Sequence, residues 1–296
     1  MTKAFTSKDY DKDPKSFTLE TADSYFIRET MAYVKGSPAA LADAVTVIVW
    51  FHGFFVDKRS TLFNDLPGKE VKLLENLKKC PIDALICIAP FMGYVKDEKE
   101  QILKDNKPIP VLGKDKKPIP GKFKMRNIGS PQYRGVETKL GAAADDYLAK
   151  ILEGLANFYT DKKQALTGSD GKPRTAFTIK NLILACHSGG GVAMQAFVGG
   201  LGSSNTAALK GCWCFDCLYG GGPDFWGKQY KGTAPFYAYY QDTEDNAKAL
   251  LKQMGHERDA EFSDPGSTLN VIDNSGKSHY RTASEGFPER LKNVKL

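Results

Sequence analysis

Short apolar runs alternate with segments of helical periodicity along most of this 296-residue chain. The runs have the length and the β-branched and aromatic content of buried strands. They are Val45–His52, Ala84–Pro90, Leu182–Cys186, Leu209–Leu218, Pro235–Tyr240 and Thr268–Ile272. Between them, apolar residues recur every three or four positions, which predicts helices. These helices cover Leu66–Lys79, Val136–Tyr159, Val192–Val198 and Thr243–Met254.

The alternation of strands and helices indicates an α/β fold. Buried strands joined by helices predict a mostly parallel central sheet with helices on both faces. The length suits one large α/β domain, and we expect a single domain over residues 1–296. Before the first central strand, Phe17–Val34 predicts edge strands, although Ala22–Val34 also fits a helix.

The segment Gly93–Gly135 interrupts the alternation. It is too long for an ordinary connection and is rich in lysine, glycine and proline. Two Pro-Ile-Pro units, at 108–110 and 118–120, exclude a helix and predict extended or hairpin backbone. The segment follows a strand end, at the edge where such sheets bind ligands. We therefore expect insertion 93–135 to form part of a lid or entrance wall, with a surface loop of no such role as the alternative.

The most informative chemistry follows the run Leu182–Cys186. The run stops at His187-Ser188, and three glycines precede the next helical segment. A sharp strand-to-helix turn can hold a serine hydroxyl out above the sheet edge only if its neighbours are very small, which is the logic of a nucleophile elbow. Cys186 stands where this pattern usually has glycine. A flexible turn or a phosphate-binding loop is the alternative interpretation.

Two other strand ends extend this pattern. An early strand ends in the pair His52-Gly53, and the last strand leads to His279. With Ser188 between them, this order of motifs resembles the α/β-hydrolase superfamily over about residues 45–291. The resemblance implies an α/β-hydrolase fold with a serine nucleophile.

The resemblance also implies which groups surround the nucleophile. The backbone amides of Phe54 and Gly189 would form an oxyanion hole. Aromatic and methionine side chains that follow strand ends would line an acyl or alcohol pocket, with burial in the core as the alternative for each. These residues are Phe54, Phe55, Phe91, Met92, Tyr94, Tyr219 and Trp226.

One of the four histidines fits a catalytic base. His52 belongs to the His-Gly turn, and His256 lies at the polar end of a helix. His187 precedes Ser188 on a tight turn, so we expect its side chain to point away from the serine. His279 alone follows a late strand, in a loop with glycine and serine. We therefore assign the base to His279.

Two aspartates are candidates for the acid that orients the base. Asp216 lies in the apolar run Cys212–Leu218, where a carboxylate requires a designated partner to offset its desolvation. Asp242 follows the next strand, the usual position in the superfamily, but a helix N-cap role would explain it fully. We favour Asp216 and keep Asp242 as the alternative acid.

These residues predict a serine hydrolase that cleaves a carboxylic ester through an acyl-enzyme intermediate, namely a carboxylesterase. An amidase or peptidase with the same triad is one alternative, and a non-catalytic binding protein on a hydrolase fold is another. We expect a small-molecule ester as the partner and no cofactor or metal. The natural substrate and the oligomeric state stay open.

Composition excludes several other classes. The net charge of +6 comes largely from insertion lysines without interleaved aromatics, so we expect no nucleic acid partner. No apolar run reaches the roughly 18 residues of a transmembrane segment, and residues 1–16 lack the apolar core of a secretory signal. The six cysteines argue against a disulfide framework, and Cys212, Cys214 and Cys217 lack zinc-site spacing. We expect a cytoplasmic protein, with secretion after leader removal as the alternative.

Overall fold

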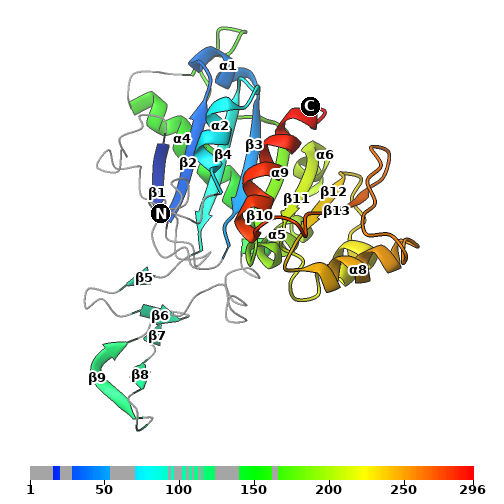
Figure 1. The fold of residues 1–296 in the computed structure, drawn as a ribbon. Coiled ribbons are helices and arrows are strands. Elements are labelled where there is room, and N and C mark those ends of the chain that lie inside the picture. Colours follow the sequence, from blue (N-terminus) through cyan, green and yellow to red (C-terminus); the bar gives the residue numbers. More distant parts are fainter. Residues whose placement is uncertain are drawn as a thin grey trace.

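A computed structural model describes residues 16–20, 29–53, 71–92, 95–96, 102–104, 107–108, 110–112, 115, 117–123, 140–161 and 166–296. Its main element is an eight-stranded sheet with the strand order β1-β2-β4-β3-β10-β11-β12-β13 (Figure 1). The strands are β1 (Ser16–Glu20), β2 (Glu29–Lys35), β3 (Val45–Phe51), β4 (Leu85–Phe91), β10 (Ile179–His187), β11 (Leu209–Phe215), β12 (Phe236–Tyr240) and β13 (Leu269–Asp273).

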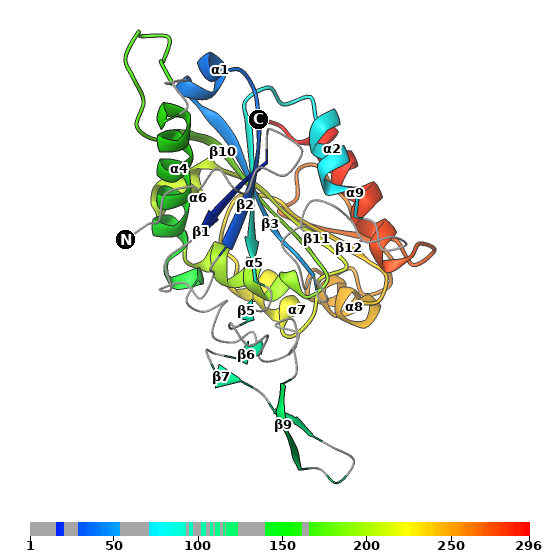
Figure 2. The ribbon, with the colours of Figure 1, turned by 90° about the vertical axis from the view of Figure 1, so that its left-hand side faces the viewer.

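All neighbouring strands from β4 to β13 are parallel, whereas β2 pairs antiparallel with both β1 and β4. Helices cover both faces of this sheet, so the predicted α/β architecture is confirmed (Figure 2). One face carries α4 (Ala144–Asp161), α5 (Gly190–Gly199) and α8 (Glu244–Gln253), and the other carries α2 (Leu73–Lys79) and α9 (His279–Asn293). Shorter helical elements are α1 (Pro38–Asp43), α6 (Ser203–Ala208), α7 (Gly222–Asp224) and the π-helix η5 (Phe225–Gln229).

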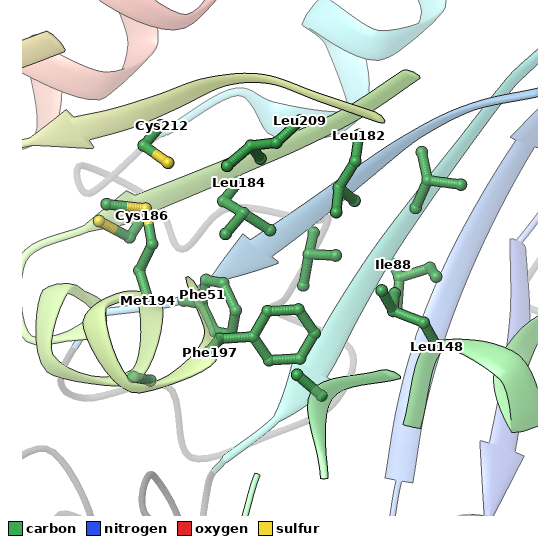
Figure 3. Close-up of a cluster of buried hydrophobic side chains, with 14 of the residues drawn as sticks. Phe51, Ile88, Leu148, Leu182, Leu184, Cys186, Met194, Phe197, Leu209 and Cys212 are labelled. Carbon is green, nitrogen blue, oxygen red and sulfur yellow. The ribbon is translucent and has the colours of Figure 1, made fainter. Parts of the chain in front are cut away.

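The core has two layers because successive side chains of a strand point to opposite faces. Along β3, Val49 and Phe51 belong to the layer under α4 and α5, while Trp50 belongs to the layer under α2 and α9. In the first layer, Phe51 packs against Phe197 of α5 with ring centroids 5.3 Å apart (Figure 3). Strands buried on both faces explain why the sequence shows continuous apolar runs.

Several elements differ at their ends from the sequence predictions: α2 begins at Leu73 rather than Leu66, and β10 begins at Ile179 rather than Leu182. The strand predicted to reach Leu218 ends at Phe215, because Asp216 takes a left-handed backbone conformation with φ of 50°. His279 was expected in a loop, but it is the first residue of α9. The Ser278 side chain caps this helix by accepting a hydrogen bond from the amide of Arg281.

The described parts of insertion 93–135 form two small sheets. One contains β5 (Val95–Lys96), β6 (Ile102–Lys104) and β7 (Lys107–Pro108), and the other contains β8 (Pro110–Leu112) and β9 (Pro118–Phe123). The extended backbone predicted around the Pro-Ile-Pro units is confirmed. Figure 1 shows these strands beyond the sheet edge at which β3 and β4 end. A lid or entrance wall stays a prediction.

Candidate active site

Ser188 lies at the sharp turn between β10 and α5. Its φ of 53° places a non-glycine residue in the left-handed region, and such strain is concentrated at functional sites. The amide of Ser188 donates a 3.1 Å hydrogen bond to the carbonyl of Phe215, which ties the turn to the end of β11. This hydrogen bond fixes the backbone of Ser188 beside the end of β11.

The turn requires neighbours without side chains. A methyl group at Gly190 would overlap the Phe51 carbonyl, and one at Gly191 would overlap the Cys217 carbonyl. At Gly53, after β3, a Cβ atom would lie 2.8 Å from the Cβ of Ser188. The prediction that the serine needs very small neighbours is therefore confirmed.

Asp216 and His279 form a direct pair at the carboxyl-terminal edge of the sheet. The Oδ2 atom of Asp216 lies 2.6 Å from Nδ1 of His279, and the Asp216 side chain is fully buried. Because a carboxylate only accepts, Nδ1 carries the proton in this pair. That tautomer leaves Nε2 of His279 free to accept a proton.

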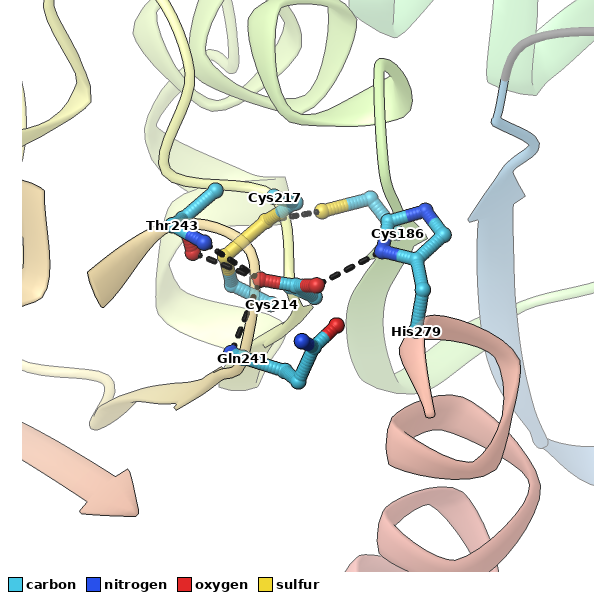
Figure 4. Close-up of a disulfide and its surroundings, with 7 residues drawn as sticks. Cys186, Cys214, Cys217, Gln241, Thr243 and His279 are labelled. Atoms are coloured by element: carbon cyan, nitrogen blue, oxygen red, sulfur yellow. Dashed lines mark hydrogen bonds and ion pairs between the residues drawn. A yellow bond between two sulfur atoms is a disulfide. The ribbon is translucent and has the colours of Figure 1, made fainter. Parts of the chain in front are cut away.

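Four further hydrogen bonds hold the Asp216 carboxylate. Its Oδ1 accepts from the amides of Gln241 (3.0 Å) and Thr243 (2.9 Å) and from the Thr243 hydroxyl (2.8 Å), while Oδ2 accepts from the amide of Asp242 (2.9 Å). Figure 4 labels three of the partners, Gln241, Thr243 and His279. Burial alone would raise the pKa of Asp216, but the hydrogen bonds from His279 and the 241–243 segment outweigh it and lower the pKa to about 2.

The alternative acid faces the same ring nitrogen. Oδ2 of Asp242 lies 3.6 Å from Nδ1 of His279, and the Asp242 side chain is 53% exposed. The N-cap role considered for Asp242 is wrong, because Thr243 occupies the N-cap position of α8. Both candidate acids are therefore beside His279, but only Asp216 is buried and within hydrogen-bond distance.

The residue before Ser188, His187, contacts the His279 ring and so brings the nucleophile turn next to this pair. The ring centroids of His187 and His279 lie 4.4 Å apart. No hydrogen bond joins the Ser188 side chain to the His279 ring within the described residues. Catalytic hydrogen bonds are often long in proteins without bound substrate and tighten in the reacting complex.

His52 organises the loop that follows β3. Its Nδ1–H donates to the Gly53 carbonyl (2.7 Å), and its Nε2 accepts from the amide of Met92 at the end of β4 (2.9 Å). Burial lowers the pKa of His52 to about 4, so the ring stays neutral and can both donate and accept. Phe54, the predicted oxyanion residue after Gly53, lies outside the described residues.

Gly189 is the other predicted oxyanion donor. It is the N-cap residue of α5, directly after Ser188, where helix amides have no partner within the helix. Within the described part of the chain, its N–H makes no hydrogen bond. No such partner among the described residues competes with the predicted oxyanion role of this N–H.

Of the expected pocket residues whose side chains the structure describes, two are buried and one is half-buried. Trp226 is core, because it is 2% exposed and stacks on Phe236 with ring centroids 3.8 Å apart. Met92 is also buried, at 1% exposure. Tyr219 is half-buried, and burial together with the negative charges of Asp216 and Asp242 raises its pKa. Phe55 and Tyr94 lie outside the described residues, as does the Phe91 side chain.

Two clusters have the residue types of metal ligands. The sulfurs of Cys186, Cys214 and Cys217 lie within 4.8 Å of one another, but Cys214 and Cys217 form a disulfide (Figure 4). The expectation that the cysteines form no disulfide is therefore wrong for this pair, while Cys80, Cys87, Cys186 and Cys212 are free and buried. The second cluster is Asp216, Asp242 and His279. Both Asp216 oxygens already accept hydrogen bonds, which makes this cluster a poor metal site.

Sequence reasoning missed one residue of the site. His187 was expected to point away from Ser188, but its contact with His279 was not foreseen. The available signal was its position, because a histidine buried beside a tight turn needs a hydrogen-bond partner.

Comparisons with known proteins add only a similarity of shape. No family model matches this chain, and no curated protein matches it. Among solved structures, the BES protein from Bacillus cereus matches with a TM-score of 0.47 and 11% identity, over 98% of this chain and 100% of that one. The siderophore hydrolase EstB from Aspergillus nidulans matches with a TM-score of 0.47 and 10% identity, over 96% of both chains. An S-formylglutathione hydrolase from Agrobacterium tumefaciens matches with a TM-score of 0.42 and 12% identity, over 94% of this chain and 92% of that one.

The chain's own topology agrees with the resemblance seen in the sequence. A serine at a strand-to-helix turn and a histidine after the last strand lie at one edge of a mostly parallel sheet with helices on both faces. This is the arrangement of an α/β-hydrolase fold. No helix in the described ranges has the length and apolarity needed to cross a membrane.

Proposed function

We propose that this protein is a serine hydrolase that cleaves carboxylic esters through an acyl-enzyme intermediate. The observation that carries the proposal is the pairing of the buried Asp216 with His279, beside the strained turn of Ser188. A serine hydroxyl is a poor nucleophile until a base takes its proton, and the base needs an acid to select its tautomer.

In the proposed reaction, the Ser188 oxygen attacks the ester carbonyl while Nε2 of His279 takes the hydroxyl proton. Asp216 accepts from Nδ1 and stabilises the imidazolium. The N–H groups of Gly189 and Phe54 stabilise the oxyanion, and one such donor contributes on the order of 3 kcal/mol. The tetrahedral intermediate expels the alcohol, which receives the proton from His279. Water then attacks the acyl-enzyme by the same steps, releasing the acid and free Ser188.

Labelling with a fluorophosphonate tests the nucleophile. Ser188→Ala should abolish labelling and lower ester turnover by about six orders of magnitude, as loss of a triad nucleophile does. Ser203→Ala, an exposed serine at the start of α6, is the matched control and should change neither. Ester turnover by Ser188→Ala within tenfold of wild type would contradict the proposal. Hydrolysis of p-nitroanilides as fast as p-nitrophenyl esters would indicate an amidase instead.

We also propose that insertion 93–135 forms part of the substrate entrance. This rests on the start of the insertion after β4, which runs parallel to β3 and β10 and therefore ends at the same sheet edge as the strand before Ser188. Replacing residues 105–121 by a short Gly-Ser linker should change the preference among ester chain lengths while a small phosphonate still labels Ser188. Unchanged kinetics on every ester would assign the insertion no part in substrate selection.

A further inference from the structure

His187 is buried between the nucleophile turn and the start of α9. Its Nε2 lies 3.1 Å from the backbone carbonyl of His279, and the carbonyl can only accept, so Nε2 carries the proton. Its ring also contacts the His279 ring, with centroids 4.4 Å apart, and the Tyr280 ring, with centroids 5.5 Å apart. One side chain thus touches both the backbone and the imidazole of the proposed base.

The other edge of the His187 ring faces the loop after β3. A Cβ atom at Gly53 would lie 3.2 Å from Nδ1 of His187 and 2.8 Å from the Cβ of Ser188. His187 is 4% exposed, so this backbone and α9 leave its ring little freedom to rotate. Because Ser188 follows His187 directly, the ring connects the nucleophile turn to the base.

His187 is suited to hold a base without competing with it. Burial first, and then repulsion from His279, lower the pKa of His187 to about 3. The ring is therefore neutral at neutral pH, with its single proton in the bond to the His279 carbonyl. It adds no positive charge beside the imidazolium that forms on His279 during catalysis.

We propose that His187 is a positioning residue for the catalytic base: its Nε2–H and its ring hold the first turn of α9 so that His279 reaches both Asp216 and Ser188. This inference rests on the proposed function, since it has meaning only if His279 is the base. In this proposal His187 acts through His279 and not on the ester itself.

Three variants separate its two contacts. His187→Gln keeps a donor near Nε2 but removes the ring, His187→Phe keeps a ring without the donor, and His187→Ala removes both. His256→Gln is the matched control, because His256 is partly exposed after α8 and its ring interacts with the nearby Asp259 and Phe262, away from the candidate site. Each variant is compared with wild type for kcat and KM on a p-nitrophenyl ester, and its folding is checked by thermal unfolding.

A displacement of about 1 Å in a catalytic group costs about 100-fold in rate. We therefore expect His187→Ala to lower kcat about 100-fold with KM nearly unchanged. The kcat of His187→Gln should be about tenfold higher than that of His187→Ala. A merely structural role would lower the unfolding temperature without this rescue. His256→Gln should match wild type.

The outcomes separate the two proposals. If wild type shows no Ser188-dependent hydrolysis, both the proposed function and this inference are refuted. If wild type is active but folded His187→Ala keeps kcat within about threefold, or folded His187→Gln is no faster than His187→Ala, the positioning role is refuted while the proposed function stands. If His187→Ala does not fold, the other two variants decide: a kcat equal to that of wild type in both His187→Gln and His187→Phe would also refute the positioning role.

Discussion

Replacing Asp216 by asparagine tests the acid through the geometry of its five hydrogen bonds. Oδ1 accepts from three donors, so the asparagine oxygen is expected to take that position. The amide NH₂ then replaces Oδ2 and faces two groups that need an acceptor, the amide of Asp242 and Nδ1 of His279. His279 can relieve the conflict only by moving its proton to Nε2. That tautomer cannot accept the proton of Ser188.

The expected loss in turnover is large. Trapping a triad histidine in the wrong tautomer costs about 10⁴-fold in kcat, which corresponds to about 5 kcal/mol of transition-state stabilisation. The amide of Asp242 also loses its acceptor, which costs about 1–3 kcal/mol of folding stability. Both effects arise without any change in side-chain size.

Asp242→Asn is the matched control, since its carboxylate faces the same Nδ1. The separation is 3.6 Å and the side chain is 53% exposed. Exposed ion pairs contribute about 0.2–1 kcal/mol, so we expect a loss of no more than about fivefold in kcat. The ratio of the two losses identifies the acid more securely than either loss alone.

Both variants and the double variant are assayed for kcat on a p-nitrophenyl ester, with urea unfolding as the check on folding. If Asp242 partly replaces the missing acid, the double variant should be slower than Asp216→Asn. Turnover of folded Asp216→Asn within tenfold of wild type would refute the reasoning. A larger loss in Asp242→Asn would assign the acid to Asp242.

Three further outcomes follow from the turn and its surroundings. Gly190→Ala should destabilise the protein by about 1–3 kcal/mol through overpacking, whereas Gly199→Ala, with nothing near its Cβ, should not destabilise it in urea unfolding. His187 has a pKa lowered to about 3, so the unfolded chain binds a proton below about pH 6.5 that the folded chain does not. The free energy of unfolding of wild type should therefore fall from pH 7 to pH 5. In His187→Gln this fall should be smaller by about 2 kcal/mol. Equal falls in both proteins would contradict this reasoning. In denaturant without reductant, iodoacetamide should modify four cysteines, and after reduction it should modify six, as measured by intact mass. Modification of six cysteines without reductant would refute the disulfide.

The sequence predicts most of the sheet because strands buried on both faces leave continuous apolar runs. β3 and β12 lie within one residue of their expected bounds. The sequence does not predict the start of α9 at His279, because a serine such as Ser278 fits a loop as well as a helix N-cap. The disulfide was missed for a related reason. Cys214 and Cys217 are only three residues apart, and their sulfurs meet because the chain turns at Asp216.

The choice between two acids illustrates how far local reasoning reaches. A carboxylate in an apolar run needs a partner, and this alone favours pairing Asp216 with His279. The sequence could not show that Gln241, Asp242 and Thr243 would supply the other donors, because they come from the turn after another strand. Asp242 therefore serves Asp216 through its backbone amide, while its carboxylate lies near His279. The two aspartates are parts of one arrangement, and removing the Asp242 side chain leaves the amide that holds Asp216 in place.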